Sequence, residues 1–204
     1  RFTEWTEAVM KGWQDRKWSW DMQGLSMHNY TVVNWNKKLA SVGFGATEYA
    51  QVLKSTLEME DLITNYSAIM DKYDPQKKIA LVVDEWGIWT DVEPGTNPGF
   101  LFQQNSLRDA LIAGTTLNIF NNHADRVRMA NLAQTVNVLQ SVILTKGSQM
   151  LLTPTYHVFD LYKVHQDAKL IPLQFDSPDY TNGDAKIPAL NVSASKDSTG
   201  AMHI

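Results

Sequence analysis

Two adjacent carboxylic acids, Asp84 and Glu85, follow the apolar run 79–83, which reads Ile-Ala-Leu-Val-Val. Such a run is typical of a strand that is buried on both faces of a parallel sheet. In barrels and open α/β sheets, active sites gather at the carboxyl ends of the strands. Carboxylates serve there as general acids, general bases and nucleophiles. Glu85 is therefore the best candidate for catalysis, and the alternative is a structural acid that pairs with an arginine or caps a helix.

Asp84 is the weaker of the two candidates because successive strand residues point to opposite faces. We expect Glu85 to face the site and Asp84 to face away from it. Trp86 and Trp89 follow in the same segment. Both rings are candidates for a flat surface against a sugar, and the alternative is that they pack at the rim of the sheet.

A second group of polar residues, His28-Asn29-Tyr30, ends the preceding predicted strand, 24–30. In a parallel sheet this group lies at the same edge as Glu85. A phenol at that position can hydrogen-bond a carboxylate and hold its orientation. Apolar Leu25 and Met27 alternate with Ser26 and His28, as expected for a strand with one polar face.

Composition and motifs exclude several classes of function. The chain has 204 residues, 44% of them hydrophobic, and a formal net charge of -4. This predicts a folded protein without the basic excess that nucleic acid or an anionic membrane requires. No apolar run approaches the roughly 18 residues of a membrane span. Cysteine is absent, the histidines form no zinc motif, and no nucleotide-binding or serine-hydrolase motif occurs, so we expect no cofactor and no metal.

The predicted elements alternate between strand and helix up to about residue 167. Helices are expected over 3–17, 47–73, 102–116 and 153–165, and strands over 24–30, 79–83 and 129–136. This order indicates an α/β fold of βαβ units, either an open sheet or a barrel. From about residue 168 only short extended runs remain, which predicts a second, all-β unit that is cut off at Ile204. Residues 1–167 are too few for a complete (β/α)8 barrel, which needs about 250.

The chain begins with Arg1 instead of Met, and no signal-like segment follows. We therefore expect that processing or truncation removed the true beginning. Export and location, cytoplasmic or secreted, stay open.

Four segments together carry a family resemblance: V-V-D-E-W-G-I-W (82–89), E-P-G-T-N-P-G-F (93–100), L-N-I-F-N-N-H-A-D-R-V-R-M-A-N-L-A-Q-T-V-N-V (117–138) and T-P-T-Y-H-V-F-D-L-Y-K-V-H (153–165). They resemble α-L-arabinofuranosidases of glycoside hydrolase family 51 over nearly the whole chain. The resemblance implies a (β/α)8 barrel with a jelly-roll-like β-sandwich. Residues 1–167 would be the C-terminal part of that barrel, and 168–204 the beginning of the sandwich.

The same resemblance implies roles for individual residues in the release of terminal arabinofuranose from arabinoxylan and arabinan. Glu85 matches the nucleophile, and Tyr30 the tyrosine that orients it. Trp89 and Gln134 match residues that contact the sugar, and His28 joins them as a candidate for substrate binding. Family members often read H-Y-Y where this chain has His28-Asn29-Tyr30, and D-E-W-N where it has Gly87 as the fourth residue.

One expected residue is absent: the family's acid/base glutamate follows an asparagine, and no Asn-Glu pair occurs in residues 1–204. Retaining hydrolysis needs two carboxyl groups about 5 Å apart. We therefore expect residues 1–204 alone to be inactive, and the intact protein to be a retaining, exo-acting enzyme. Family members are often oligomeric, which makes a homo-oligomer the expectation.

Three alternatives stay open. The first is an endo-β-glucanase of the same family. The second is a non-catalytic carbohydrate-binding fragment, suggested by the missing acid/base residue. The third is a metal-dependent hydrolase that uses Asp84, His28 and His123.

Overall fold

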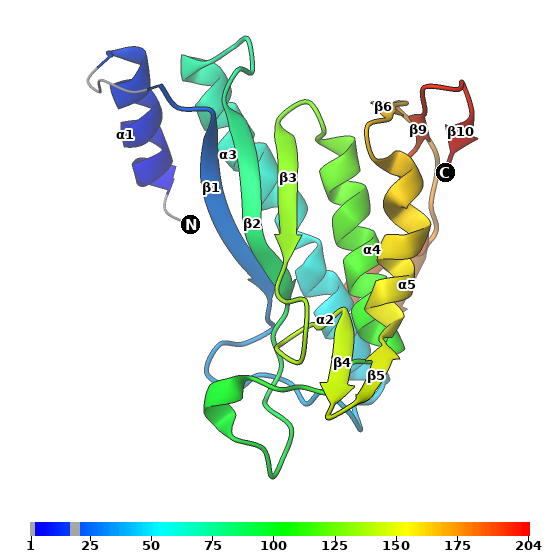
Figure 1. Cartoon of the computed structure of the whole chain (residues 1–204). Coiled ribbons are helices and arrows are strands. Elements are labelled where there is room, and N and C mark those ends of the chain that lie inside the picture. The colour runs from blue at the N-terminus through cyan, green and yellow to red at the C-terminus, as the bar shows by residue number, and fades with distance from the viewer. Residues whose placement is uncertain (1–2, 17–20) are drawn as a thin grey trace.

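A three-stranded parallel sheet forms the centre of the molecule (Figure 1). The structure is a computed structural model that describes residues 3–16 and 21–204. The strands lie side by side in chain order, β1 (Gly24–Thr31), β2 (Ala80–Ile88) and β3 (Val127–Leu132). Parallel neighbours need a crossover between them, and helices provide it here. The carboxyl ends of all three strands therefore lie at one edge, as the sequence predicts.

Helices cover one face of the sheet. The crossover from β1 to β2 contains α2 (Ala46–Thr56) and α3 (Glu58–Tyr73), and the crossover from β2 to β3 contains α4 (Leu107–Asn122). Before β1, α1 (Thr3–Gln14) packs against α3. In the described residues, no helix is both long enough and apolar enough to cross a membrane.

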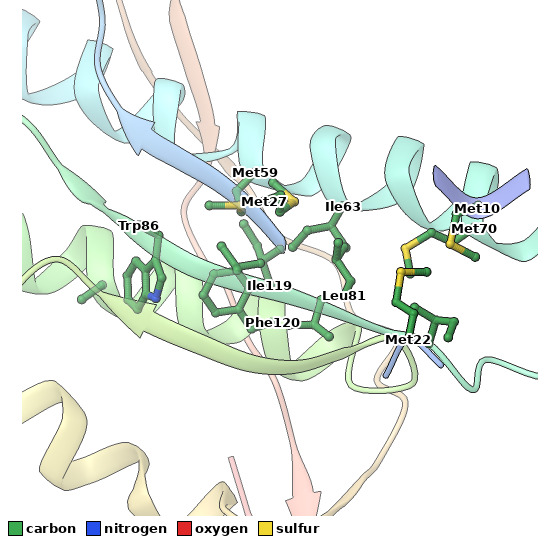
Figure 2. Close-up of a cluster of buried hydrophobic side chains, with 14 residues drawn as sticks. Met10, Met22, Met27, Met59, Ile63, Met70, Leu81, Trp86, Ile119 and Phe120 are labelled. Atoms are coloured by element: carbon green, nitrogen blue, oxygen red, sulfur yellow. The ribbon is translucent and has the colours of Figure 1, made fainter. Parts of the chain in front are cut away.

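The main hydrophobic core lies between the sheet and these helices. Leu81, Val83 and Trp86 of β2 point into it, and Figure 2 shows Leu81 and Trp86 beside Ile119 and Phe120 of α4. Trp86 is 1% exposed, and its ring meets Phe120 edge-on at a centroid distance of 5.3 Å. Trp86 is therefore neither a flat surface for a sugar nor packed at the rim of the sheet, because this indole is part of the core.

A second group of elements follows β3. The antiparallel hairpin of β4 (Ile143–Lys146) and β5 (Gln149–Leu152) leads into α5 (Pro154–Tyr162) and the short 3-10 helix Lys163–His165. Thr153 caps α5 by accepting a hydrogen bond from the backbone N–H of Tyr156, and Pro154 occupies the first turn. This start of the helix is as predicted.

The terminal segment, 168–204, contains only short strands. In one small antiparallel sheet β9 (Ser195–Lys196) lies between β6 (Lys169–Leu170) and β10 (Met202–His203), and β7 (Asp179–Asn182) and β8 (Ala185–Pro188) form a hairpin. The hairpin packs against α2. Lys54 donates a hydrogen bond to the carbonyl of Asp184 at 3.1 Å, and Asn118 of α4 donates to the carbonyl of Asn191 at 2.9 Å. The segment thus runs along the outside of the helical layer.

Several predicted boundaries differ from the structure. The helix expected over 47–73 is two helices that meet at Leu57, and the strand expected over 129–136 spans 127–132. The helix expected over 102–116 begins at Leu107, because Ser106 and Asp109 form a capping box there. The helix expected over 3–17 ends at Gln14, and residue 17 lies outside the described residues. The strand expected over 79–83 continues to Ile88, since the chain keeps pairing with both neighbours.

Candidate active site

A β-bulge in β2 decides where the two carboxylates point. The pairing with β1 changes register there, since Ser26 lies opposite Val82 but His28 lies opposite Glu85. One residue of β1 therefore faces two residues of β2, and the alternation of side chains shifts by one. Asp84 and Glu85 consequently lie on the same face of the sheet, opposite the helices. The expectation that Asp84 faces away from the site is wrong for this reason.

Each carboxylate oxygen of Glu85 has a close polar neighbour. The Tyr30 hydroxyl donates to Oε1, and Nδ1 of His28 lies 2.8 Å from Oε2. Burial raises the pKa of the Tyr30 phenol well above its usual value, and the Glu85 carboxylate adds to this effect. Tyr30 therefore stays protonated and remains a donor. The geometry thus brings together the three residues that the sequence places at the ends of two neighbouring strands.

Asp84 extends the same row of polar groups. Its Oδ1 lies 3.0 Å from Nε2 of His28 and accepts a 2.7 Å hydrogen bond from the Ser26 hydroxyl. The imidazole therefore lies between two carboxylates. We refer to Ser26, Asp84, His28, Glu85 and Tyr30 as the polar row. Ser26 and Asp84 are additions that the sequence did not predict, because regular alternation hides the bulge.

Aromatic side chains border the row where β1 and β2 end. The Trp89 ring meets Tyr30 edge-on at a centroid distance of 5.0 Å and Trp35 at 5.8 Å. Nζ of Lys38 lies 5.4 Å from the centre of the Trp89 ring, at a distance typical of a cation–π contact. The predicted proximity of Trp89 to Tyr30 is present in the structure. Trp35, which is 47% exposed, and Lys38 were not predicted from the sequence. The high tryptophan content was the only signal for Trp35, and no pattern marked Lys38.

Gln134 lies at the same edge, just beyond the end of β3. The backbone N–H of Ala133 donates to the carbonyl of Trp86 at 2.8 Å, so this segment continues beside β2. Ala133 also packs in a small cluster with Tyr30. The Gln134 side chain is exposed. All five predicted site residues therefore gather at the carboxyl edge of the sheet.

Two buried glutamines hold the backbone that carries Trp89. Oε1 of Gln140 accepts from the N–H of Ile88 at 2.9 Å. Gln103 accepts from the N–H of Thr90 at 2.9 Å and donates to the carbonyl of Ile88 at 3.1 Å. Both amides are at most 1% exposed, so they replace the hydrogen bonds that a neighbouring strand would provide. No local sequence pattern predicts these two glutamines, because their partners lie 52 and 15 residues away in the chain.

Gly87 makes room for one of these amides. Its φ of +145° is unfavourable for other residues, and a Cβ there would lie 3.3 Å from both the Gln140 Oε1 and the Ala133 carbonyl oxygen. The positive φ and the close contacts thus explain why glycine, and not a residue with a side chain, occupies the fourth position of D-E-W-G.

His123 lies apart from the polar row. It follows α4, and its Nε2 lies 2.6 Å from Oε1 of Glu60 on α3; this hydrogen bond raises the pKa of His123. The metal set of the third alternative, Asp84, His28 and His123, is therefore not assembled. Over residues 3–16 and 21–204, no three His, Asp or Glu side chains are arranged to hold a metal ion.

Comparisons with known proteins show to which family the chain is similar. The family model described as "Alpha-L-arabinofuranosidase C-terminal domain" matches residues 84–202. An "Intracellular exo-alpha-L-arabinofuranosidase" from Bacteroides ovatus is 46% identical over 203 residues, which cover 98% of this chain and 38% of the relative.

Two solved structures are similar along almost the whole chain. The GH51 arabinofuranosidase from Xanthomonas axonopodis pv. citri has a TM-score of 0.93 and 54% identity, with 98% of this chain and 40% of that chain covered. A family 51 alpha-L-arabinofuranosidase from Bifidobacterium longum, 23% identical, has a TM-score of 0.73 over 97% of this chain and 40% of its own, which shows a shared fold. The chain thus spans about two fifths of the length of these relatives.

Proposed function

Because the chain belongs to the α-L-arabinofuranosidases of glycoside hydrolase family 51, we propose that it is the nucleophile-bearing part of a retaining, exo-acting enzyme. The substrates are arabinoxylan, arabinan and their oligosaccharides, from which the enzyme releases terminal arabinofuranose. One observation carries the proposal: Glu85, at the carboxyl edge of a parallel sheet, accepts a hydrogen bond from Tyr30 at one oxygen and lies against the His28 ring with the other.

In the proposed reaction, a carboxylate oxygen of Glu85 attacks the anomeric carbon of the arabinofuranose. The bond from this carbon to the leaving oxygen breaks, and a second carboxylic acid protonates that oxygen. The same group then takes a proton from water, which attacks the anomeric carbon and releases Glu85. This acid lies outside residues 1–204, which contain no Asn-Glu pair, so these residues alone are inactive.

The other members of the site bind and orient. Tyr30 holds the Glu85 carboxylate in place by a hydrogen bond, and the His28 ring lies 2.8 Å from its other oxygen. Trp89, edge-on to Tyr30, provides an apolar surface for the sugar ring. Gln134, exposed at the same edge, reaches a sugar hydroxyl. Its amide can both donate and accept, as a hydroxyl requires.

The fold belongs to the same proposal: residues 1–167 are part of a (β/α)8 barrel, and residues 168–204 begin a β-sandwich. Helices cover one face of the parallel sheet, and the opposite face carries the polar row, as on the outer and inner sides of such a barrel. In the described residues, β1 and β3 each pair on one side only, which leaves room for further strands.

The decisive test is Glu85→Ala in the full-length protein. Hydrolysis of an aryl α-L-arabinofuranoside is expected to fall by roughly a thousandfold or more, as after loss of other nucleophiles. Azide fits the space left by the carboxylate, so it should restore turnover and give an arabinosyl azide of inverted configuration. Unchanged turnover of the variant, or an inverted first product from the wild type, would refute the proposal.

Substrate choice is tested on polymers. The proposal expects arabinose release from arabinoxylan or arabinan, whereas cleavage of a soluble β-glucan without arabinose release would identify an endo-β-glucanase. Binding of arabino-oligosaccharides by the full-length protein without turnover would indicate a carbohydrate-binding protein.

Location and assembly complete the proposal. The Bacteroides ovatus relative is named intracellular, which supports a location inside the cell. We also propose that the intact protein is a homo-oligomer. Light scattering of the purified full-length protein measures its mass directly.

A further inference from the structure

Three aromatic side chains lead outward from Glu85. The Tyr30 hydroxyl donates a hydrogen bond to Glu85, and the Trp89 ring meets Tyr30 edge-on at a centroid distance of 5.0 Å. The Trp35 ring in turn meets Trp89 edge-on at 5.8 Å. Exposure increases along this series, because Tyr30 is buried, Trp89 is partly buried and Trp35 is 47% exposed. The series therefore runs from the candidate nucleophile to the solvent.

Trp35 is held in place within the loop that follows β1. The backbone N–H of Asn36 donates to Oδ1 of Asn34 at 2.9 Å, which fixes a tight turn around Trp35. Nζ of Lys38 lies 5.8 Å from the centre of the Trp35 ring and 5.4 Å from the centre of the Trp89 ring. One ammonium thus contacts both indoles, at distances typical of cation–π contacts. The half-exposed Trp35 ring is therefore restrained without being buried.

The same loop is fastened to the segment that carries Trp89. The N–H of Asp91 donates to the carbonyl of Leu39 at 3.1 Å, and the hydroxyl of buried Ser41 donates to Glu93 at 3.1 Å. Backbone and side-chain hydrogen bonds thus join the two loops, in addition to the contact between the rings. The two tryptophans therefore keep a fixed position relative to each other.

An exo-acting enzyme that holds the terminal arabinofuranose at Glu85 must direct the rest of the substrate toward solvent. The leaving oxygen carries this rest, which begins with a second pentose of arabinan or of a xylan backbone. A pentose ring has C–H groups on its faces, and an exposed indole offers them a large, flat apolar surface. Trp89 lies against Tyr30 beside the terminal sugar, which leaves Trp35 for the next one.

We propose that Trp35 forms the surface on which the second sugar of the substrate packs, and that Lys38 holds its indole in position. The inference rests on the proposed function, because it takes Glu85 as the nucleophile at which the terminal arabinofuranose is bound. Trp35 thereby selects substrates in which this arabinofuranose is linked to another pentose.

A second exposed ring near this edge provides the contrast. Phe100, on the loop after β2, is 70% exposed and lines a cavity of about 570 Å³ with Leu101 and Val138. In the part of the chain that the structure describes, no ring contact joins Phe100 to Trp89. Phe100 is thus an exposed aromatic side chain outside the series, and we expect it to have no role in selecting the second sugar.

The test compares the wild-type full-length protein with Trp35→Ala on two kinds of substrate. α-1,5-Arabinotriose and an arabinosyl-xylotriose place a second sugar beyond the leaving oxygen, whereas methyl α-L-arabinofuranoside has only a methyl group there. In Trp35→Ala we expect kcat/KM for the oligosaccharides to fall by roughly tenfold through a higher KM, because one aromatic contact is lost. For the methyl glycoside the loss should be much smaller.

The control variants separate sugar binding from a structural role. Trp35→Phe keeps an aromatic face and should retain most of the preference for oligosaccharides, and Phe100→Ala should show the wild-type preference. A loss in Trp35→Ala on only one of the two oligosaccharides would also support the inference and identify the backbone that supplies the second sugar. An equal loss on all three substrates, or no loss on any, would overturn it. A loss of preference in Phe100→Ala alone would place the second sugar elsewhere and overturn it as well.

The contribution of Lys38 is measured separately. Lys38→Met removes the ammonium and keeps a side chain of similar length, so KM for the oligosaccharides should rise by roughly two- to fivefold. Lys37→Met is the matched control, since Lys37 is exposed and, among the described residues, lies over no aromatic ring. An unchanged KM in Lys38→Met would count against the inference.

The two proposals fail in different ways. If the wild-type protein releases no arabinose from any of the three substrates, the proposed function is wrong. If it does, and Trp35→Ala keeps the wild-type preference, only the role of Trp35 is wrong. Thermal melts establish that each variant is folded. If Trp35→Ala does not fold, Trp35→Leu replaces it, because leucine keeps apolar bulk without an aromatic face and should lose the preference in the same way.

Discussion

The two faces of the β1–β2–β3 sheet differ in what their residues do. On the helix side, Leu81, Val83 and Trp86 are almost completely buried and pack with side chains of α3 and α4. On the other side, the Asp84 and Glu85 side chains are each 35% exposed and both lie close to His28. Asp84 accepts a hydrogen bond from Ser26, and Glu85 accepts one from Tyr30. One strand therefore supplies both the core and the candidate site.

The energetic contribution of the two faces is also different. Burial of one large aliphatic side chain contributes about 1.5–3 kcal/mol to stability, whereas a partly exposed ion pair contributes about 0–1 kcal/mol. Residues of the helix side should therefore govern stability, and residues of the polar row should govern activity. The bulge separates the two sets, because it returns Trp86 to the core after two successive polar residues.

The largest expected effect is on activity alone. Glu85→Gln removes the nucleophilic charge, and kcat/KM of the full-length protein should fall by roughly a thousandfold or more. The melting temperature should change little, because Glu85 is partly exposed and its loss of charge removes the repulsion with Asp84. Glu4→Gln, at an exposed position of α1, is the matched control. A large loss of stability in Glu85→Gln would break the division between the faces.

The converse change is Leu81→Ala on the helix side. Leu81 is 0% exposed, and its truncation should lower the free energy of unfolding by about 2–5 kcal/mol. Urea unfolding measures the loss, and kcat/KM of the folded variant should stay near the wild-type value. Leu161→Ala, on a side chain that is 71% exposed, should leave both quantities nearly unchanged. A specific loss of activity in folded Leu81→Ala would contradict the comparison.

Gln140→Met tests a position that serves both faces. The N–H of Ile88 loses its acceptor, and a buried unsatisfied donor costs about 1–3 kcal/mol. The segment that carries Trp89 should also shift, so KM for arabino-oligosaccharides should rise more than kcat falls. Gln51→Met on the exposed side of α2 is the control. An unchanged KM in a destabilised Gln140→Met would reduce this glutamine to a purely structural role.

The smallest expected effect depends on pH and concerns the helical layer. The hydrogen bond with Glu60 raises the pKa of His123 above its unfolded value of about 6.5. A raised pKa stabilises the fold below the unfolded value, and this stability disappears as the pH rises through the folded value. His123→Gln should therefore lower the free energy of unfolding by up to about 1 kcal/mol below about pH 6. At pH 8 the decrease should be smaller. Urea unfolding at both pH values checks this, with exposed His157→Gln as the control.

Local patterns predicted the elements that carry the site. The apolar run 79–83 and the alternation in 24–30 correspond to β2 and β1, and Thr153-Pro154 begins α5. These features follow from side chains close together in the chain, where burial pattern and capping act locally. The positions of Tyr30 and Glu85 at one edge followed from the parallel order of the strands.

Other features arose only when distant segments paired. Two buried glutamines, Gln103 and Gln140, take the place of a neighbouring strand beside Ile88. Their hydrogen-bond partners lie far away in the sequence. No window of neighbouring residues contains this information.

The sequence by itself determined that a carboxylate and a phenol end two inner strands. The order of apolar and polar residues along each segment shows both that it is a strand and where it ends. Only the tertiary structure decided that Asp84 joins Glu85 on one face with His28 between them. The physical reason is the register of β1 against β2, in which one extra residue is accommodated as a bulge and every later side chain changes sides.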